Sequence, residues 1–392
     1  MDIPYLDDAL KLSGYTRDLR RDFHQHPELG FKEYRTASIV ARELNSLGLE
    51  VTTGIAETGV VATLEGSRPG PVVMLRFDMD ALPIDEETDA EYASLTPGVM
   101  HACGHDGHTA IGLTVAQLLA TYSKDLMGKV KFVFQPAEEG LGGAESMLAE
   151  GVLEDPKPDI SLAMHLWNEK QAGWLGISPG PVMAAAELFR VRVTGKGGHG
   201  GMPDQTIDPI LTTAQIITAL QSIPSRNISP LHSAIISIGS IHGGEVFNVI
   251  PSQVEFQGTI RSFEPSVRQV VLDRFERVVT RTAESMGCEV DIKMQMLTPA
   301  VINDPSITDR VNQVAQSLLP ESYIAEHYRS MVSEDMAFIM QDIPGCYVFV
   351  GSANPDKGLD ASHHHPRFDF DEEILPYAVA LVAAATVRCL ES

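Results

Sequence analysis

Apolar residues recur at helical spacing in the first fifty residues of the chain. The segments 8–27 and 32–48 carry apolar side chains every three or four positions, and the second segment ends at Gly48. Such spacing places apolar side chains on one face of a helix, and a glycine commonly follows a helix end. The pattern predicts a helix-rich segment from Tyr5 to about Gly48.

Short apolar runs then alternate with helical patterns. Runs typical of buried strands lie at 72–77, 129–134, 160–167 and 346–351, and helical patterns lie at 109–123, 142–151, 306–319 and 372–390. Strands that alternate with helices are typical of an α/β domain with a mostly parallel sheet. We therefore expect an α/β fold on both sides of the middle of the chain.

A different pattern occupies residues 184–297. Its strand-like segments alternate apolar and polar residues, as strands do when one face of their sheet is in solvent. The order of elements is β-α-β-β-α-β, the ferredoxin-like split βαβ arrangement. We predict a discontinuous catalytic domain of residues 1–183 and 298–392, interrupted by an inserted α+β domain of residues 184–297.

Length and charge agree with two domains of a globular protein. A chain of 392 residues exceeds what one hydrophobic core usually supports, and 44% of the residues are hydrophobic. Lys and Arg number 29 against 53 Asp and Glu, which gives a net charge of -24. Such a field repels phosphate groups, so nucleic acid and anionic membranes are not expected as partners.

The chain also lacks the usual signs of export. Its first residues are acidic, without the basic start and apolar run of a secretory signal, and we find no apolar stretch near the ~20 residues that a membrane span needs. Cys288, Cys346 and Cys389 lie in apolar settings, where buried free thiols are expected. These features predict a cytoplasmic protein.

The densest group of chemically reactive side chains is MHACGHDGHT at 100–109. Cys103 and His105 are two residues apart, so both side chains point to one side of an extended segment. A thiolate with an imidazole is a ligand pair suited to zinc and related metals. A polar loop without a metal is the alternative for this stretch taken alone.

Further ligand-type side chains follow the predicted strands. They are Asp78 and Asp80 after 72–77, Glu138 and Glu139 after 129–134, His165 closing the run at 160–164, and His363, His364 and His365 after 346–351. Ligands of open α/β sheets bind beyond the carboxyl ends of the strands, so this convergence predicts a metal site. His24 and His26 are interpreted as packing residues, and His101 and His108 as residues that hold ligands by hydrogen bonds.

The pair Glu138 and Glu139 suggests a hydrolytic mechanism. Such a site needs one carboxylate on the metal and another that takes a proton from water. Adjacent glutamates in the first turn of a helix, where the helix dipole favours acidic residues, are the alternative.

Eight stretches carry a resemblance to a known family. They are HQHPELGF, RFDMDALPI, MHACGHDGHTA, FQPAEEG, MHLW, GKGGHGGMPD, NVIPSQVEFQGTIRSF and HHPRFDFDEE. Together they resemble the M20 metallopeptidase and amidohydrolase family, in its branch of hippurate hydrolases, indole-acetyl-amino-acid hydrolases, aminoacylases and carboxypeptidases. They span almost the whole chain.

The resemblance implies a role for each matching residue of the predicted catalytic domain. The implied ligands of one or two divalent metal ions are Cys103, His105, Glu139, His165 and His364. Zinc is the first choice of ion, with manganese, cobalt or nickel as alternatives. Glu138 would be the general base, Asp80 would support the site, and Asp106 would lie close to the metals. Whether His364 or a neighbouring histidine is the ligand stays open.

The resemblance also assigns roles in the inserted domain. His199 would stabilise the oxyanion, often in the partner subunit's site, and Asn248 and Arg261 would bind the substrate carboxylate. Family members usually pair through this domain, which implies a homodimer or homotetramer and a dimerisation or lid role. The family often has a histidine where Asp204 stands here, so the role of Asp204 is not assigned.

The expected function is metal-dependent hydrolysis of an amide bond, in N-acyl amino acids or at the C-terminus of short peptides. The acyl group and the amino acid are not defined by the sequence. A non-catalytic metal- or ligand-binding relative is one alternative. A dinucleotide enzyme is another, because Gly195, Gly197 and Gly200 form G-x-G-x-x-G, but no acidic residue follows about 20 positions later.

Overall fold

The computed structural model describes residues 4–391 and divides into two compact units. The first unit comprises Met1–Gly180, Ile302–Arg329 and Asp335–Ser392, and the second comprises Pro181–Val301 and Ser330–Glu334. The boundary therefore lies a few residues outside the predicted insert of 184–297, and the short segment 330–334 also belongs to the second unit. The outermost residues of the predicted catalytic domain, 1–3 and 392, lie outside the described part.

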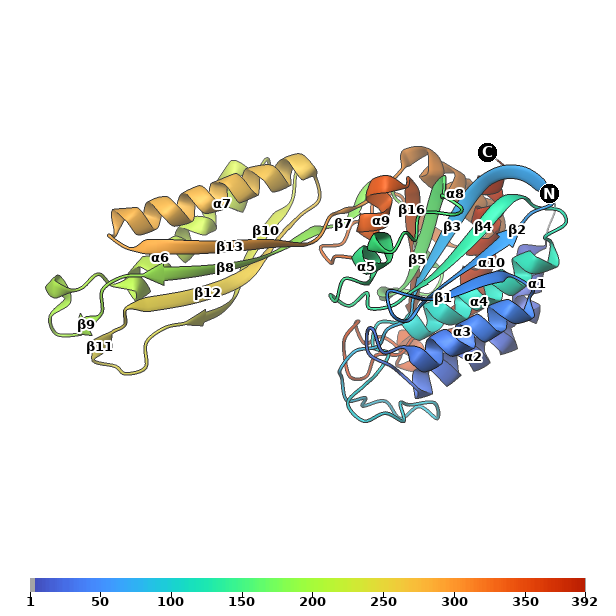
Figure 1. The fold of residues 1–392 in the computed structure, drawn as a ribbon, viewed down its shortest axis with the longest axis horizontal. Coiled ribbons are helices and arrows are strands. Elements are labelled where there is room, and N and C mark those ends of the chain that lie inside the picture. Colours follow the sequence, from blue (N-terminus) through green and yellow to red (C-terminus); the bar gives the residue numbers. More distant parts are fainter. Residues whose placement is uncertain (1–3, 392) are drawn as a thin grey trace. The chain divides into compact units, whose positions relative to one another are not determined.

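The first unit contains a mixed, mostly parallel sheet of eight strands in the order β1-β2-β4-β3-β5-β16-β6-β15 (Figure 1). The strands are β1 Glu50–Ile55, β2 Gly59–Glu65, β3 Arg68–Asp78, β4 Met127–Gln135, β5 Ile160–Gln171, β6 Trp174–Gly176, β15 Tyr323–Ala325 and β16 Gly345–Ala353. The central strands β4, β3, β5 and β16 pair in parallel. Their apolar runs are buried, as in sheets covered on both faces. The predicted α/β fold is confirmed.

Helices cover this sheet. They are α1 Tyr5–Lys11, α2 Ser13–Gln25, α3 Tyr34–Ser46, α4 His105–Thr121, α5 Gly143–Ala149, α8 Pro305–Leu318, α9 Met336–Asp342 and α10 Leu375–Leu390. Helix α4 is almost wholly buried and packs on β3, so its first residue, His105, lies near the carboxyl end of that strand. The four cysteines are free and buried, as expected of those at 288, 346 and 389.

The sequence patterns did not predict the antiparallel hairpin of β1 and β2. Its connection contains Ala56 and Glu57, both with positive φ, at 49° and 70°. Hairpin turns with such angles usually carry asparagine, aspartate or glycine, so the expected signal is missing here. The strands β6 and β15, of three residues each, and helix α9 were also not predicted.

One helix is long and apolar enough to cross a membrane by length and composition. The window Glu372–Leu390 has 19 residues, and 78% of it is buried inside the structure. The segment is not an uninterrupted apolar stretch, because Glu372, Glu373 and Arg388 lie within it. Burial in the core accounts for its composition, because a helix that is apolar all round packs inside a large domain.

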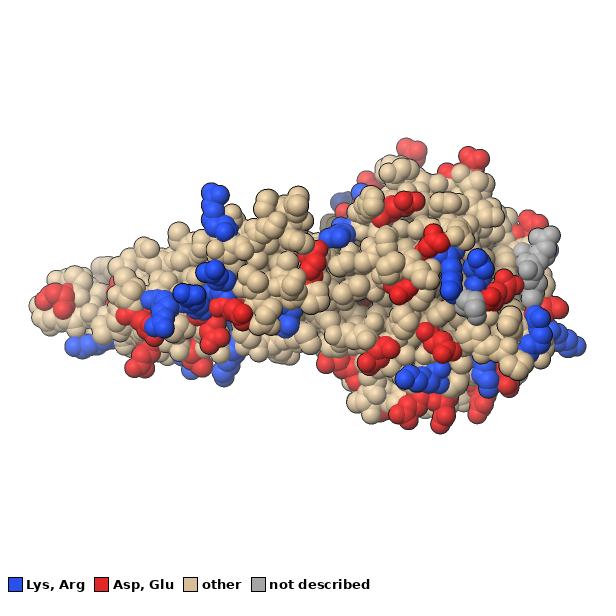
Figure 2. All heavy atoms as spheres, turned by 90° about the horizontal axis from the view of Figure 1, so that it is seen from above, with Lys and Arg blue, Asp and Glu red and all other residues tan. Residues whose placement is uncertain are grey.

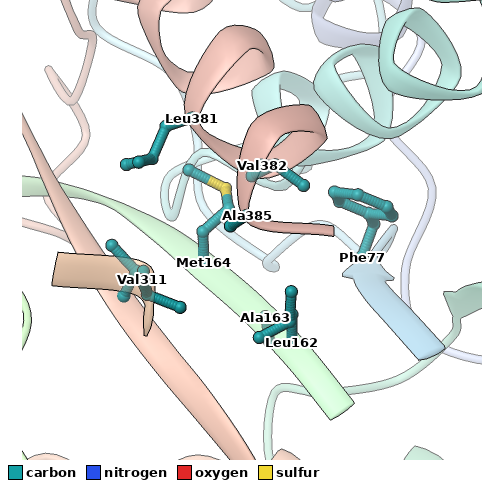
Figure 3. Close-up of a pocket in the computed structure, with 9 residues that line it drawn as sticks. Phe77, Leu162, Ala163, Met164, Val311, Leu381, Val382 and Ala385 are labelled. Atoms are coloured by element: carbon teal, nitrogen blue, oxygen red, sulfur yellow. The ribbon is translucent and has the colours of Figure 1, made fainter. Parts of the chain in front are cut away.

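A small apolar cavity lies between this helix and the sheet. Phe77, Met164, Val311 and Leu381 are among its lining residues (Figure 3). Its volume of about 20 Å³ is close to that of one water molecule. Because the lining is apolar, the cavity is a local gap in packing and offers no polar group for a ligand.

The second unit has a four-stranded sheet in the order β10-β12-β8-β13. Its elements are β7 Gly180–Met183, β8 Ala185–Thr194, β9 Gly198–His199, α6 Pro209–Leu220, β10 Ala234–His242, β11 Val249–Ile250, β12 Gln253–Ser262, α7 Pro265–Ser285, β13 Glu289–Thr298 and β14 Val301–Asn303, of which β7 and β14 span the boundary between the units. Helices α6 and α7 cover one face of this sheet (Figure 1). The order β8-α6-β10-β12-α7-β13 is the predicted one.

The other face of this sheet is polar. Arg190 and Arg192 of β8 form ion pairs with Glu255 of β12. Figure 2 shows acidic and basic side chains intermixed over both units. The alternating pattern in the sequence is thus explained by one apolar and one solvated face.

A glycine-to-alanine pair tests how closely α4 must approach the sheet. A Cβ on Gly112 of α4 would lie 2.6 Å from the Phe77 ring, whereas one on Gly14 of α2 would meet nothing within 4 Å. Gly112→Ala should lower the free energy of unfolding by about 1–3 kcal/mol through overpacking. Gly14→Ala should leave it unchanged or raise it by up to about 1 kcal/mol. Chemical denaturation measures both, and equal effects would contradict this packing argument.

Candidate metal centre

The five predicted metal ligands lie together in the first unit. Their donor atoms, with that of Glu138, form three overlapping groups whose members lie within 4.8 Å of one another: Cys103, His105 and His165; Cys103, Glu139 and His364; and His105, Glu138 and Glu139. His105 is the first residue of α4 and Cys103 lies just before it. The two glutamates follow β4, His165 lies in the middle of β5, and His364 lies in the segment between β16 and α10. His165 lies inside β5, which continues to Gln171, and does not close the strand as expected.

Asp80 orients two of these residues. Nδ1 of His105 lies 2.9 Å from the Asp80 carbonyl oxygen and 3.2 Å from its Oδ1, where it donates. The other carboxylate oxygen of Asp80 accepts a hydrogen bond from the backbone N–H of Glu139 at 3.0 Å. Nε2 of His105 is buried and has no hydrogen-bond partner among the described residues. This is the arrangement of a metal-binding histidine whose second nitrogen is held by a carboxylate.

The electrostatics of the cluster call for a cation. Burial raises the pKa of the Cys103 thiol well above its usual value, and Glu139 and Glu138 raise it further. Burial and the neighbouring His108 and His363 lower the pKa of His165 well below its usual value, so its imidazole is neutral. A bound divalent cation would stabilise the thiolate form of Cys103 despite the neighbouring carboxylates. It would also bind the neutral imidazole of His165.

The charge on His105 leads to the same conclusion. Burial by itself would lower the pKa of His105, but Asp78 and Asp80 raise it to about 10. These carboxylates favour a positive charge on His105, and a divalent cation would meet the same demand. The Cys103 thiol and Nε2 of His105, which has no hydrogen-bond partner among the described residues, are donors that fit a divalent transition metal.

His108 and His101 differ from each other although both flank the cluster. Nε2 of His108 accepts the backbone N–H of Leu166 at 2.9 Å, so Nδ1 donates to Asp78 at 2.6 Å. Both nitrogens of His108 are used, which excludes it as a ligand, but its hydrogen bonds reach Asp78 and the Leu166 backbone and none of the five predicted ligands. Neither nitrogen of the buried His101 has a partner among the described residues, so the expectation that it holds a ligand is wrong.

The run of three histidines contributes His364 to the cluster. Nε2 of His364 lies 3.1 Å from Oε1 of Glu139, and its backbone N–H donates to Ala102. His363 instead donates from Nε2 to the Leu166 carbonyl, and Nδ1 of His365 accepts from the N–H of Arg367. His364 also has a φ of 64°, an uncommon conformation for a non-glycine residue and one often found at functional sites.

Glu138 and Glu139 lie on a turn between β4 and α5. Ala137, just before them, has a φ of 55°. Helix α5 begins only at Gly143, so the alternative that the two glutamates open a helix is wrong. A tight turn allows the two neighbouring side chains to serve different partners.

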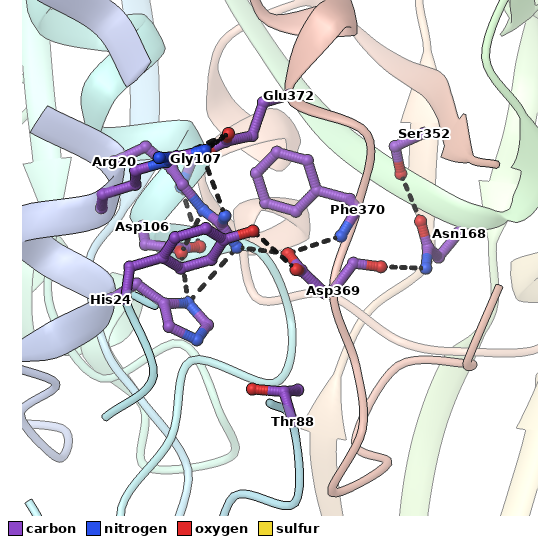
Figure 4. Close-up of polar contacts among 12 residues, drawn as sticks. Arg20, His24, Thr88, Asp106, Gly107, Asn168, Ser352, Asp369, Phe370 and Glu372 are labelled. Carbon is purple, nitrogen blue, oxygen red and sulfur yellow. Dashed lines mark hydrogen bonds and ion pairs between the residues drawn. The ribbon is translucent and has the colours of Figure 1, made fainter. Parts of the chain in front are cut away.

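Asp106, which follows the predicted ligand His105 in the chain, is not a member of the three ligand groups. The fully buried Arg20 binds Asp106 at 2.9 Å and Asp369 at 2.7 Å, and it also pairs with Glu372 (Figure 4). His24 donates to Asp106 at 2.7 Å, which makes it more than the packing residue that was expected. This network joins α2, α4 and the segment after the histidine run.

Sequence reasoning missed Arg20 and also Glu33. The carboxyl group of Glu33 is buried and accepts the backbone N–H of Ala137 at 2.9 Å. Their partners are 86 and 104 residues away in the chain, so no local pattern reveals these contacts.

His199, Asn248 and Arg261 all belong to the second unit. His199 on β9 pairs with Val249 on β11, and the N–H of Gly200 donates to the Asn248 carbonyl, so His199 and Asn248 are close. Nδ1 of His199 accepts the N–H of Gly201, which leaves Nε2 for an outside partner. Nη1 of Arg261 on β12 is buried without an acceptor among the described residues.

The glycines near His199 allow close approach of backbone segments. A Cβ on Gly195 would lie 2.2 Å from the Ile207 carbonyl oxygen, and one on Gly197 would lie 2.7 Å from that of Ile250. Strand β9 and a short 3₁₀ turn follow them before α6 begins, so this G-x-G-x-x-G is not the start of a dinucleotide-binding helix. The dehydrogenase alternative has no structural support.

Thiol, imidazole and carboxylate donors, of which Cys103, His105 and His165 are buried, form a candidate metal centre beside a mostly parallel α/β sheet. The family model described as Peptidase family M20/M25/M40 matches residues 74–387. The chain belongs to this family, as the resemblance indicated.

Named relatives cover most of the chain. Thermostable carboxypeptidase 1 of Saccharolobus solfataricus is 39% identical over 97% of this chain and 97% of its own length. N-acetylcysteine deacetylase of Bacillus subtilis is 39% identical over 96% and 97%. N-acyl-L-amino acid amidohydrolase of Geobacillus stearothermophilus is 45% identical over 72% and 76%. The chain is therefore a hydrolase that acts on amide bonds.

A solved structure has the same fold. The YXEP protein of Bacillus subtilis, described as a dinuclear metal binding peptidase from the M20 family, superposes with a TM-score of 0.85. It is 35% identical, with 97% of this chain and 99% of that chain covered. Together with the ligand groups, this supports divalent metal binding by this chain.

Alanine substitutions at two adjacent histidines test the assignment of His364. His364→Ala should reduce the metal content per subunit after dialysis against a fixed metal concentration, because one donor of the cluster is lost. His365→Ala is the matched control and should retain the wild-type content, because its ring contacts Arg367 and not the cluster. Elemental analysis measures both, and metal loss in His365→Ala alone would contradict the assignment.

Proposed function

We propose that this enzyme cleaves the amide bond of N-acyl amino acids, or the C-terminal bond of short peptides, with Glu138 as the general base. The observation that carries the proposal is the turn on which both glutamates lie near His105, while only Glu139 also joins a group with Cys103 and His364. A ligand and a base held one residue apart suit activation of water. The relatives named carboxypeptidase, deacetylase and amidohydrolase favour this substrate class.

A bound divalent ion, for which zinc is our first choice and manganese, cobalt or nickel the alternatives, supplies a Lewis acid that makes water acidic near neutral pH. One or two ions per subunit are expected, since Cys103 belongs to two of the ligand groups. Glu138 takes the proton from water and later gives it to the leaving nitrogen. Asp80 keeps His105 and the Glu139 turn in place during this transfer.

The second unit supplies substrate contacts in this proposal. The buried, unpartnered Nη1 of Arg261 is a donor for the free carboxylate of an amino acid, to which guanidinium binds in a fork. Asn248 assists at the same carboxylate, and Nε2 of His199 stabilises the oxyanion. We further propose that subunits pair through this unit, as a homodimer or homotetramer, and that the protein acts in the cytoplasm.

A substrate panel tests the proposed function. N-acetyl, N-benzoyl and indole-acetyl amino acids and dipeptides are incubated with enzyme that has been chelated, and with enzyme restored with zinc or manganese. At least one class should be hydrolysed by the restored enzyme, with loss of activity on chelation. If no member is cleaved by metal-loaded protein, the proposed substrate class is wrong and the non-catalytic alternative gains support.

Adjacent substitutions test the division of roles between the two glutamates. Glu138→Ala should lower kcat by at least about 100-fold, in line with the loss of a general base, with metal content nearly unchanged. Glu139→Ala should lose both activity and metal, because it removes a ligand. Steady-state kinetics and elemental analysis of the two variants measure this difference. Equal metal loss in both would show that the assignment is wrong.

A further inference from the structure

Glu33 is a buried acidic residue that the mechanism above does not use. Its side chain is shielded from solvent, just before α3 begins. One carboxyl oxygen accepts the backbone N–H of Ala137 at 2.9 Å, and the other accepts the Thr58 hydroxyl at 2.5 Å. A buried carboxyl group is costly unless its oxygens are hydrogen-bonded, so these two bonds are what stabilise it there.

The contact to Ala137 reaches the residue immediately before Glu138. Ala137 has a φ of 55°, in the left-handed region that disfavours residues with a side chain. Such a conformation persists only where surrounding contacts hold it. The carbonyl of Ala137 accepts the N–H of Gly143, and its own N–H is held by Glu33.

The loop before Glu33 also packs directly on this turn. A Cβ on Gly30 would lie 3.0 Å from the Ala137 Cα and 2.7 Å from a Leu141 methyl carbon. The same loop contacts the segment of Asp80, because the N–H of Ala81 donates to the Glu28 carbonyl at 2.8 Å. The loop before Glu33 therefore contacts both the turn that carries Glu138 and the segment that carries Asp80.

We propose that Glu33 is a positioning residue for amide hydrolysis, which fixes the N–H of Ala137 and thereby the turn that aims Glu138. The inference rests on the proposed function, because Glu33 acts through the general base. Asp80 holds the N–H of Glu139 on the other side of Glu138, so two buried carboxyl groups fix the turn. Glu33 touches neither substrate nor metal in this role.

The role requires a hydrogen-bond acceptor and not a negative charge. Burial raises the pKa of Glu33 to about 7, so both protonation states are populated near neutral pH. The carboxylate accepts both bonds. The protonated group can donate its O–H to the Thr58 hydroxyl and still accept from Ala137. A glutamine side chain offers the same acceptor and donor.

Two substitutions with side chains similar in volume to glutamate distinguish a need for a hydrogen-bond acceptor from a need for a negative charge. Glu33→Met removes the acceptor and should lower kcat by between about 10- and 100-fold with little change in KM, because a small displacement of the base costs rate more than binding. Glu33→Gln should restore kcat to within about twofold of wild type and leave the pH profile of kcat unchanged. Glu33→Ala, which vacates the space, is a second acceptor-free variant if Glu33→Met does not fold.

Glu28 provides the matched control. Its carboxylate accepts the N–H groups of Arg35 and Thr36 at the start of the same helix, α3, and does not contact the turn. Glu28→Ala should lower the unfolding temperature and leave kcat per metal-loaded subunit unchanged. Kinetics, metal content and thermal unfolding are measured for every variant on the best substrate of the panel.

Three outcomes would overturn the inference. They are wild-type kcat in a folded, metal-loaded Glu33→Met or Glu33→Ala enzyme, a loss in Glu33→Gln as large as in Glu33→Met, and an equal kcat loss in Glu28→Ala. Failure of the proposed function looks different, because the wild-type enzyme would then cleave no substrate of the panel.

Discussion

A space that holds a thiol, imidazoles and carboxyl groups away from water is stable only when their charges are compensated. In this structure the Cys103 thiol is kept protonated by burial and by neighbouring carboxylates, and the imidazole of His165 is kept neutral. A divalent cation relieves both costs, because it favours the thiolate and binds the neutral ring. The other contacts of the site serve to hold these donors around one place.

Two buried arginines form ion pairs with buried carboxylates in the first unit. Arg20 binds Asp106, and although burial would raise the pKa of Asp106, Arg20 and His24 hold it far below its usual range. Arg76 binds Asp78 at 2.6 Å and Asp335 at 2.8 Å. Each arginine therefore offsets the negative charge of two buried carboxylates. Removing either arginine would leave a buried, uncompensated charge, which costs about 3–5 kcal/mol.

The sequence predicted those parts of the fold that depend on local pattern. The strands β3, β4, β5 and β16 are buried on both faces, so their apolar runs are continuous and easily found. Their carboxyl ends share one edge, so the residues that follow them could be expected to converge. The hairpin of β1 and β2 could not be found, because Ala56 and Glu57 carry no turn signal.

The supporting residues could not be predicted because their partners are distant in the chain. Arg20 and Glu33 lie in helical or loop segments whose composition is ordinary, and only the folded sheet brings them to Asp106 and Ala137. His101 shows the opposite error, since its place in the MHACGHDGHT motif suggested a contact that the structure does not contain among the described residues.

The turn at 136–143 bears on the proposal that a base and a ligand are neighbours. Gly142 has a φ of 82°, and a Cβ on Gly143 would lie 1.8 Å from the Pro136 carbonyl oxygen, so the chain folds back on itself before α5 begins. In a helix the side chains of two consecutive residues point about 100° apart, whereas this closed turn is held by hydrogen bonds on both sides of Glu138. Glu139 is held through its own N–H by Asp80. In the proposed mechanism this bond keeps the backbone of Glu139 in place while the carboxylate of Glu138 exchanges a proton.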